Sequence, residues 1–402
     1  MTTRRVAITG TGSITPIGST DDHIISFLKA GQPCFETFVS HSDTVVCPVK
    51  NFDLIQYTGK FKHRRYLNRG ASLSVAAAMM AVKDAHIDNG LLDNAGLFTG
   101  AGPNLDMGNE FPEIINHQVN WEAIQALWIL KFLPNTAAST IAQLTGIHGE
   151  CTTVGTACAA SLQAIGDAFR KIKDGYLDIA LAGGGDSRLS SGAMMAYKKA
   201  RSIYVGSDHP NQVCRPFDQN RKGFVSGEGA AFFILEDYEH AKKRGAEIKA
   251  EILGFGASMD GYRMTDPHPD GLYAQRAVVQ AINDAKIHPD DIDLISSHGT
   301  GTQLNDKMEA ELIHRLFNRR HQPFVIALKS WIGHLSAACG AVELSVCMAC
   351  IKHDYIPEIR NLNDPCHMSV NFVVSPKSCR FNTVLLENFG FGGQNCAIIF
   401  RG

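Results

Sequence analysis

The chain has 402 residues, of which 45% are apolar and 19% charged, and this globular composition excludes a largely disordered protein. Lys and Arg number 38 and Asp and Glu number 40, which gives a formal net charge of −2. This balance excludes a dominant polybasic surface, so we expect no nucleic acid ligand.

The sequence contains no run of 18 apolar residues, so no membrane-spanning helix is expected. The first residues, MTTRRVAITGTGS, lack the apolar stretch of a signal peptide and predict a first strand instead. Eleven cysteines are scattered without a regular spacing, which is typical of reduced thiols. Together these features predict a cytoplasmic protein without membrane contact.

Strands and helices alternate in the first half of the chain. Residues 6–9 predict a strand that ends in a glycine turn, and residues 20–30 predict a helix. The Ala- and Met-rich segment 73–86 predicts a helix that is apolar on most sides and therefore buried. A strand over 151–154 leads through a turn of small residues into an amphipathic helix over 159–173.

The same alternation continues towards the C-terminus. Residues 179–182 predict a strand before three glycines, and residues 293–297 predict a strand followed by a helix over about 307–317. Alternating elements of this length predict βαβ units with parallel sheets. A charged segment ends the first half, and we predict two halves, 1–246 and 247–402, that pack as one body because no linker separates them.

Cys158 lies between a predicted strand and a predicted helix, among the small residues of GTACAAS. A thiol at a helix N-terminus faces the positive end of the helix dipole and unpaired backbone N–H groups, which lower its pKa. We therefore predict a nucleophilic thiolate with room for a substrate beside it. The alternative is a buried structural thiol, since free cysteine commonly behaves as a small apolar residue.

His298 and His334 each lie at a strand or turn end just before a predicted helix, where α/β sheets place their sites. Each histidine alone fits a structural role better, but with Cys158 they predict a Cys-His-His set. Two neutral imidazoles can donate N–H groups to one carbonyl oxygen, or one can act as a base. We expect no metal, because no short ligand pair brackets either histidine. The glycine-rich segment 389–395 is either an oxyanion-binding turn or a plain turn before the last strand.

Five ordered blocks carry a resemblance to a known family. They are GTACAAS around Cys158, PFDQNRKGFVSGEG over 216–229, HGTGTQLND from His298, KSWIGHLSAACGAVE from Lys329 and the closing FGFGG. Along nearly its whole length the chain resembles the β-ketoacyl-[acyl carrier protein] synthases of the elongating, thiolase-fold type. The resemblance implies a dimer and an α/β fold, a thiolase-like duplicated five-layer αβαβα sandwich.

The resemblance also implies a role for each matching residue. Cys158 matches the acyl-accepting nucleophile, and His298 and His334 match the two catalytic histidines. Lys329 matches a buried lysine, and Glu309 matches the acid that pairs with it. The implied reaction is a decarboxylative Claisen condensation of a Cys158-bound acyl group with malonyl-[acyl carrier protein], in fatty acid or in polyketide or aryl-polyene-type biosynthesis.

Substrate contacts are implied in the same way. The backbone N–H groups of Cys158 and Phe391 match an oxyanion hole, and the Phe391 ring matches a gate of the acyl pocket. The expected substrate-binding residues are Thr300, Thr302, Phe391, Pro103, Asp266 and Phe132. No cofactor is expected, because the phosphopantetheine arm arrives on the carrier protein.

Several residues depart from the family's pattern. Pro103 stands where an isoleucine commonly lines the acyl channel, and Asp266 stands where a serine often contacts the pantetheine arm. Leu386 and Glu387 replace a common Ser-Asn pair near a proposed monovalent-cation site at Glu343. These changes favour a specialised, polyketide-like product over primary fatty acid synthesis.

An acidic carrier protein requires a basic docking surface. The predicted docking residues are Lys62, Arg64, Arg65, Arg69 and Arg201. An ordinary solvated face is the alternative, because most charge runs are only surface. The predicted partners are an acyl carrier protein and a second copy of the chain, with a related subunit as the alternative to the second copy.

Two other functions stay open from the sequence alone. A non-catalytic partner of the chain-length-factor type resembles this family too, but it typically lacks the nucleophilic cysteine that is present here. A degradative thiolase needs a second cysteine as base in a C-terminal glycine-rich loop. Cys396 instead follows that loop, on the predicted closing strand.

Overall fold

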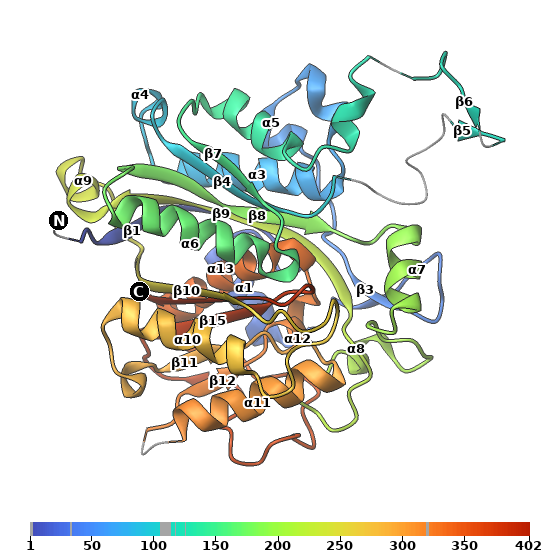
Figure 1. The fold of residues 1–402 in the computed structure, drawn as a ribbon, viewed down its shortest axis with the longest axis vertical. Helices are drawn as coiled ribbons and strands as arrows, with labels where there is room; N and C mark the ends of the chain where they lie inside the picture. The colour runs from blue at the N-terminus through green and yellow to red at the C-terminus, as the bar shows by residue number, and fades with distance from the viewer. Residues whose placement is uncertain (1–2, 33, 105–113, 117, 125, 319–320) are drawn as a thin grey trace.

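The computed structural model describes residues 3–402 except 33, 105–113, 117, 125 and 319–320, and these described residues form five layers (Figure 1). Two β-sheets lie one above the other in this view, with helices between them and further helices on both outer faces. This is the thiolase-like αβαβα arrangement that the sequence predicts.

The upper sheet in Figure 1 comes from the first half of the chain. Its main strands run in the order β1 (Val6–Ile14), β9 (Ser226–Asp237), β8 (Ile179–Ser187), β4 (Gly96–Ala101) and β7 (Cys151–Val154). β9 pairs antiparallel with β1 and β8, whereas β4 pairs parallel with β8 and β7. Helices α3 (Arg69–Asp84) and α5 (Thr136–Thr145) cover its outer face.

The lower sheet comes from the second half. Its strands run in the order β10 (Ala250–Met259), β16 (Gln394–Arg401), β15 (Thr383–Phe389), β11 (Leu294–Ser296) and β12 (Phe324–Ile326). β16 pairs antiparallel with β10 and β15, and β11 pairs parallel with β15 and β12. Helices α10 (Leu272–Ala285) and α11 (Gln303–Phe317) lie on its outer face.

The two sheets are mixed, so the prediction of parallel sheets is confirmed for β4, β7 and β8 and for β11, β12 and β15 but is wrong for the pairings of β9 and β16. Between β15 and β16 only the short turn 390–393 is available, and a turn of that length can join antiparallel strands alone. β1 also pairs antiparallel with β10, which connects the two sheets by hydrogen bonds. The division of the chain after residue 246 remains a prediction.

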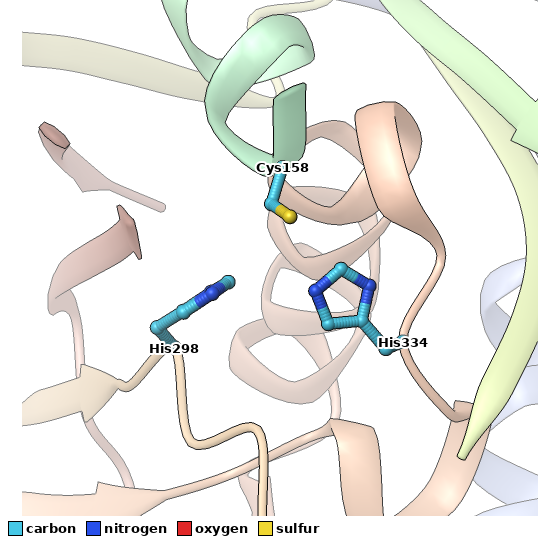
Figure 2. Close-up of side chains that lie close together, drawn as sticks. All are labelled: Cys158, His298 and His334. Atoms are coloured by element: carbon cyan, nitrogen blue, oxygen red, sulfur yellow. The ribbon is translucent and has the colours of Figure 1, made fainter. Parts of the chain in front are cut away.

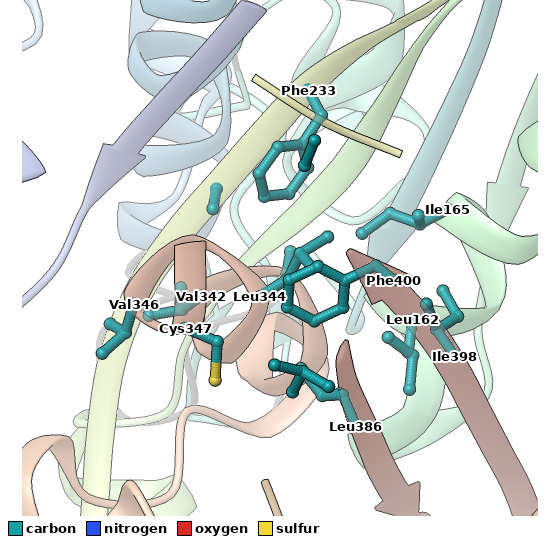
Figure 3. Close-up of a cluster of buried hydrophobic side chains, with 14 of the residues drawn as sticks. Leu162, Ile165, Phe233, Val342, Leu344, Val346, Cys347, Leu386, Ile398 and Phe400 are labelled. Atoms are coloured by element: carbon teal, nitrogen blue, oxygen red, sulfur yellow. The ribbon is translucent and has the colours of Figure 1, made fainter. Parts of the chain in front are cut away.

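The middle layer contains α1 (Asp21–Ala30), α6 (Ala160–Lys173) and α13 (Cys339–Lys352). Apolar side chains from α6 and α13 meet side chains from both sheets there (Figure 3), namely Leu162, Ile165, Phe233, Val342, Leu344, Val346, Leu386, Ile398 and Phe400. All of them are buried. Because strands of both halves contribute, this core holds the two halves together as one body.

Gly10 and Gly12 do not end the first strand, contrary to the sequence prediction. β1 continues to Ile14, and α3 packs directly on the glycines. A Cβ atom would lie 2.4 Å from the Ala81 carbonyl oxygen at Gly10 and 2.1 Å from the Ala77 carbonyl oxygen at Gly12. Glycine is therefore required here for close packing of a helix on a strand rather than for a turn.

The predicted helices are present, and two of them begin one turn earlier than expected, α3 at Arg69 and α11 at Gln303. The other helices are α2 (Ile55–Thr58), α4 (Asn89–Leu92), α7 (Ser191–Lys199), α8 (Pro210–Val213), α9 (Tyr238–Lys243) and α12 (Lys329–Ile332). Short strands are β2 (Glu36–Thr37), β3 (Val45–Cys47), β5 (Ile114–Ile115), β6 (Gln118–Val119), β13 (Tyr355–Ile356) and β14 (Lys377–Ser378). Within the described part of the chain, every helix is too short or too polar to cross a bilayer.

Candidate active site

Cys158 is presented by a tight turn between β7 and α6. Ala157, the residue before it, has a backbone φ of +49°, a conformation that L-residues other than Asn and Asp seldom adopt. A 3₁₀ turn over Ala157–Ala159 then leads into α6. Buried α6 residues anchor this helix between the sheets, and the Ser161 hydroxyl accepts a hydrogen bond from the Ala341 N–H of α13, 3.0 Å away. The turn thus places the thiol at a fixed position at the helix start.

His298 follows β11 in a loop held by two buried acids of α11. The backbone N–H groups of His298 and Gly299 donate to the two carboxylate oxygens of Glu309, at 2.5 and 2.8 Å. Asp306 accepts from the N–H groups of Gly301 at 3.0 Å and Phe217 at 2.7 Å. Both carboxylates therefore fix the backbone of the loop that carries the imidazole.

His334 follows α12 and is tied to the other half of the chain. Its N–H donates to the Val225 carbonyl at 2.7 Å, and its carbonyl accepts from the Gly227 N–H at 2.9 Å. The Ser336 N–H donates to the His334 Nδ1 at 3.0 Å. Since a backbone N–H can only donate, the neutral imidazole must carry its proton on Nε2.

The three side chains converge from three different elements (Figure 2). A ligand atom of each of Cys158, His298 and His334 lies within 4.8 Å of those of the other two. The imidazole rings stand edge to face with centroids 5.7 Å apart. All three line a cavity of about 610 Å³, and Cys158 is only partly buried, so a substrate can reach the sulfur.

Burial and a neighbouring cation keep both imidazoles neutral. Desolvation and then the Lys329 charge lower the pKa of His334 to about 3, and the same two causes hold the pKa of His298 well below its usual value. The site therefore offers two N–H donors without a net positive charge on the rings at neutral pH.

The predicted ion pair between Lys329 and Glu309 is wrong. The Lys329 Nζ lies 2.6 Å from the Glu343 Oε1, and both side chains are buried. Although burial opposes its charge, Glu343 raises the pKa of Lys329, so the lysine stays charged. Glu309 holds the His298 loop instead, and burial raises its pKa to about 7. The sequence analysis placed a proposed monovalent-cation site at Glu343. In the structure, the Lys329 ammonium group contacts the Glu343 carboxylate.

The predicted lowering of the Cys158 pKa is also wrong. Burial raises the pKa of the resting thiol to about 11, because desolvation exceeds the lowering by the Phe391 N–H and by Lys329. The position of Cys158 at a helix start predicted a lowered pKa, but desolvation by the surrounding protein outweighs that effect. The N–H groups of Phe391 and Cys158 both face the sulfur side of the cavity, as the oxyanion-hole hypothesis requires.

The cavity brings together most of the predicted substrate residues. Those that line it are Thr300, Thr302, Phe391, Pro103 and Asp266. The hydroxyl oxygens of Thr300 and Thr302 lie 2.9 Å apart, and the Asp266 carboxylate faces Arg263 at 3.1 Å. Phe132, the sixth predicted substrate residue, is not among the described residues that line the cavity. Its ring packs edge-on against the Trp128 ring, with the two centroids 4.5 Å apart.

The predicted docking cations fall into different places. Lys62, Arg64 and Arg65 are exposed on a short 3₁₀ helix. Arg69 is not available for docking, because its guanidinium lies 2.8 Å from the buried Glu228 carboxylate and donates to the Val49 carbonyl at 2.7 Å.

Arg201 is exposed and lines the cavity rim. Lys222 lies there too, on a loop far away in sequence. The sequence analysis did not assign Lys222 to docking, although Arg221 precedes it, because it looked for denser runs of positive charge.

Three further cavity residues were missed, Asp186, Arg188 and Tyr197. They lie between β8 and the end of α7, in a segment that carries no matching block. The one sequence signal for Asp186 is a charged residue at the end of an apolar, glycine-rich strand.

The cysteine and the two histidines are also the residue types that hold metal ions, and their spacing would allow one among the described residues. The charge of Lys329 opposes a cation there, because it already disfavours a proton on either ring. The Nδ1 of His334 is moreover engaged by Ser336. The donor set therefore fits N–H donation to an oxygen better than metal ligation.

The alternative thiolase site is absent from the described cavity. Cys396 lies on β16, buried in the core, and its thiol donates to the Gln163 Oε1 at 3.1 Å. It does not line the cavity that contains Cys158. Among the residues that the structure describes, Cys158 is the one cysteine that lines this cavity.

Fold and site together define the class of thiolase-fold condensing enzymes. The chain matches the families described as "Beta-ketoacyl synthase, N-terminal domain" over residues 3–241 and "Beta-ketoacyl synthase, C-terminal domain" over residues 249–363. It therefore belongs to the β-ketoacyl synthase family.

Curated relatives and solved structures agree with this assignment. The chain is 32% identical to 3-oxoacyl-[acyl-carrier-protein] synthase 2 of Vibrio cholerae, with 100% of both chains covered. It is 30% identical to the tetracenomycin polyketide synthase ketoacyl synthase alpha subunit of Streptomyces glaucescens, with 99% of this chain and 97% of that one covered. A β-ketoacyl synthase from Burkholderia phymatum superposes with a TM-score of 0.91 at 30% identity, with 99% of each chain covered. The ishigamide ketosynthase/chain length factor gives 0.89 at 30% identity, again with 99% of each chain covered.

Proposed function

We propose that the chain is a β-ketoacyl-[acyl carrier protein] synthase that joins a Cys158-bound acyl group to malonyl-[acyl carrier protein] by decarboxylative Claisen condensation. The observation that carries this proposal is the convergence of one reachable thiol and two neutral imidazoles within 4.8 Å in a single cavity. Among the described residues, this is the one cluster of three His, Cys, Asp or Glu side chains whose ligand atoms lie this close together.

In the first step, the Cys158 sulfur attacks the thioester carbonyl of an acyl carrier protein. A C–S bond forms, the carrier's sulfur leaves as a thiolate, and the proton lost by Cys158 passes to it. Negative charge develops on the carbonyl oxygen, where the N–H groups of Phe391 and Cys158 can donate to it. Because burial disfavours the free thiolate, the proton leaves as the substrate binds rather than beforehand.

In the second step, malonyl-carrier protein occupies the cavity and loses its carboxylate as CO₂. The electron pair of the broken C–C bond becomes an enolate, whose oxygen accepts hydrogen bonds from His298 and His334. The enolate carbon then attacks the acyl-Cys158 carbonyl, and the Cys158 thiolate leaves. Burial and the Lys329 charge keep both imidazoles neutral, so that they donate hydrogen bonds without protonating the carbanion.

Replacement of the nucleophile tests the proposal directly. Cys158→Ala should abolish chain extension from an acyl carrier protein and malonyl-carrier protein, measured by mass spectrometry of the product. Decarboxylation of malonyl-carrier protein should persist, because the imidazoles remain. Cys151→Ala, which removes an exposed thiol outside the cavity, is the matched control. Extension by the Cys158→Ala variant would contradict the proposal.

We infer that a carrier protein approaches the cavity rim at Arg201 and Lys222, and that Thr300 and Thr302 bind its phosphopantetheine arm. The exposed residues Lys62, Arg64 and Arg65 stay in the proposed docking surface, and Arg69 does not. Arg201→Ala should raise KM for malonyl-carrier protein about three- to tenfold at low salt with kcat retained, since rim charges act mainly on association. Arg276→Ala, an exposed arginine on α10, should leave KM unchanged.

The chain is proposed to work in the cytoplasm as a homodimer without a cofactor of its own. A ketosynthase in complex with its acyl-carrier protein and a ketosynthase/chain length factor are among the similar solved structures, which supports these partner types. Native mass spectrometry of the purified chain would distinguish a homodimer from a monomer that requires a related subunit. The presence of Cys158 favours the catalytic role over that of a chain-length-factor partner.

A further inference from the structure

One wall of the cavity is polar although it lies beyond the catalytic residues. Asp186, at the end of β8, pairs with Arg188 at 2.9 Å, and the two side chains are only 4% and 10% exposed. Both line the same cavity as Cys158. Burying two charges costs desolvation free energy unless hydrogen bonds offset it. An ion pair that lines a substrate cavity therefore suggests a role towards the substrate.

The ion pair is firmly held. Asp186 accepts hydrogen bonds from the N–H groups of Ser187 at 2.8 Å and Ala337 at 3.2 Å. Arg188 donates to the Pro103 carbonyl at 2.7 Å, and Gly102 leaves the space that its guanidinium fills, because a Cβ there would lie 2.2 Å away. This wall therefore has fixed charges and cannot retract to make an apolar channel.

Tyr197 of α7 adds a hydroxyl to the same wall. Its oxygen has a distant contact to the Ser336 hydroxyl at 3.4 Å, which leaves capacity for a further hydrogen bond. Its ring packs on Phe224 with centroids 5.3 Å apart, and Phe224 packs on the His334 ring at 4.7 Å. Tyr197 is thus positioned through one aromatic ring relative to the catalytic imidazole.

The two sides of the cavity differ in their fixed elements. Thr300 and Thr302 belong to the loop after β11, on the side of His298. Asp186, Arg188 and Tyr197 belong to the β8–α7 segment. Asp186 and Tyr197 contact the 336–338 turn that follows His334. If the threonine side receives the phosphopantetheine arm, the polar wall faces the acyl group.

We propose that Tyr197, backed by the Asp186–Arg188 pair, selects acyl groups that carry a keto or hydroxyl oxygen along the chain over saturated alkyl groups of equal length. This inference rests on the proposed function. An alkyl chain against this wall would remove water from the hydroxyl and the ion pair without replacing its hydrogen bonds. A substrate oxygen replaces them, accepting from the Tyr197 hydroxyl.

A matched pair of thioesters tests the proposal. Hexanoyl- and 5-oxohexanoyl-pantetheine have the same chain length and differ by one carbonyl. Formation of the Cys158 adduct, followed by intact-protein mass spectrometry, should be about fivefold or more faster for the oxo compound. Tyr197→Phe keeps the ring and removes the hydroxyl, and it should lower that preference about three- to tenfold, the usual effect of one hydrogen bond.

Tyr176→Phe is the control, because Tyr176 is 76% exposed and does not line the cavity. Equal rates for the two thioesters in the wild-type protein would overturn the inference, as would an unchanged preference in Tyr197→Phe. Acetyl transfer from acetyl-carrier protein to Cys158 separates this from the proposed function. If no acyl group is transferred at all, the proposed function fails; if acetyl is transferred but the oxo preference is missing, only the substrate inference fails. Should Tyr197→Phe not fold, the wild-type ratio alone decides.

Discussion

Adjacent residues of α13 belong to two buried regions of opposite character. Leu344 packs among apolar side chains of both sheets (Figure 3). Glu343, one position earlier, meets the Lys329 ammonium and the Asn388 amide, which lies 3.4 Å from the His298 Nδ1. Burial stabilises the first region by about 1.5–3 kcal/mol for each large side chain, whereas buried charges must offset their own desolvation.

The comparison separates what holds the fold from what prepares the site. The apolar region joins two sheets from distant parts of the chain and needs only shape and volume. The charged region keeps one cation beside two imidazoles, and this charge adds to desolvation in lowering their pKa. A substitution in the first should change stability, and a substitution in the second should change stability and chemistry together.

The largest effect is expected from a substitution that removes the cation of the charged region. Lys329→Met leaves Glu343 buried without its cation, and we expect a loss of about 3–5 kcal/mol in the free energy of unfolding. The condensation rate of the folded variant should fall about 100-fold or more, because the site loses a preorganised positive charge beside the two imidazoles that stabilise the enolate. Urea unfolding and kcat for extension measure the two losses separately.

Leu344→Ala is the matched change in the apolar region. The space left by the removed side chain should lower the free energy of unfolding by a similar amount, about 2–5 kcal/mol. The folded variant should retain its kcat. The double variant Lys329→Met/Glu343→Leu should recover stability but not activity. A Lys329→Met variant with near wild-type kcat would show that the lysine charge has no role in the chemistry.

The second prediction concerns the thiol of Cys158, which lines the cavity with both imidazoles. Because burial raises the pKa of Cys158 to about 11, its alkylation by iodoacetamide should accelerate about tenfold for each pH unit between 7 and 9. A plateau in that range would mean that the resting site ionises the thiol. Exposed Cys151 provides the reference rate, read by peptide mass spectrometry of the same samples.

The smallest expected effect is a pH dependence of stability. The folded-state pKa of His334 is about 3, whereas an unfolded histidine titrates near about 6.5. Below about pH 6.5 the unfolded chain therefore binds a proton that the folded chain does not, so stability falls as pH decreases towards 3. His334→Asn should remove about 2 kcal/mol of this pH-dependent loss at pH 5. Urea unfolding at pH 7.5 and pH 5 checks it, and equal pH dependence in both proteins would contradict the low pKa.

Local sequence was sufficient for much of the fold. Cap residues located α1, helical spacing located α6, and an acid-rich segment located α11. Small residues around Cys158 located the turn that presents it. The glycines of β1 were misassigned, because a glycine that admits a packed helix has the same sequence appearance as one that makes a turn. The antiparallel pairing of β9 and β16 was not predicted, since pairing between distant strands is not encoded in either strand alone.

The sequence by itself determined which residues carry the chemistry: a cysteine among small residues and two histidines at the ends of strands or turns, in ordered blocks. Tertiary structure decided the charge state of each one and its partners. It placed Glu343 rather than Glu309 on Lys329, and it paired the partly exposed Arg69 with the buried Glu228. It also brought Tyr197 and the Asp186–Arg188 pair to the cavity. The physical reason is that desolvation and Coulomb interactions depend on distance in space, which sequence separation does not give.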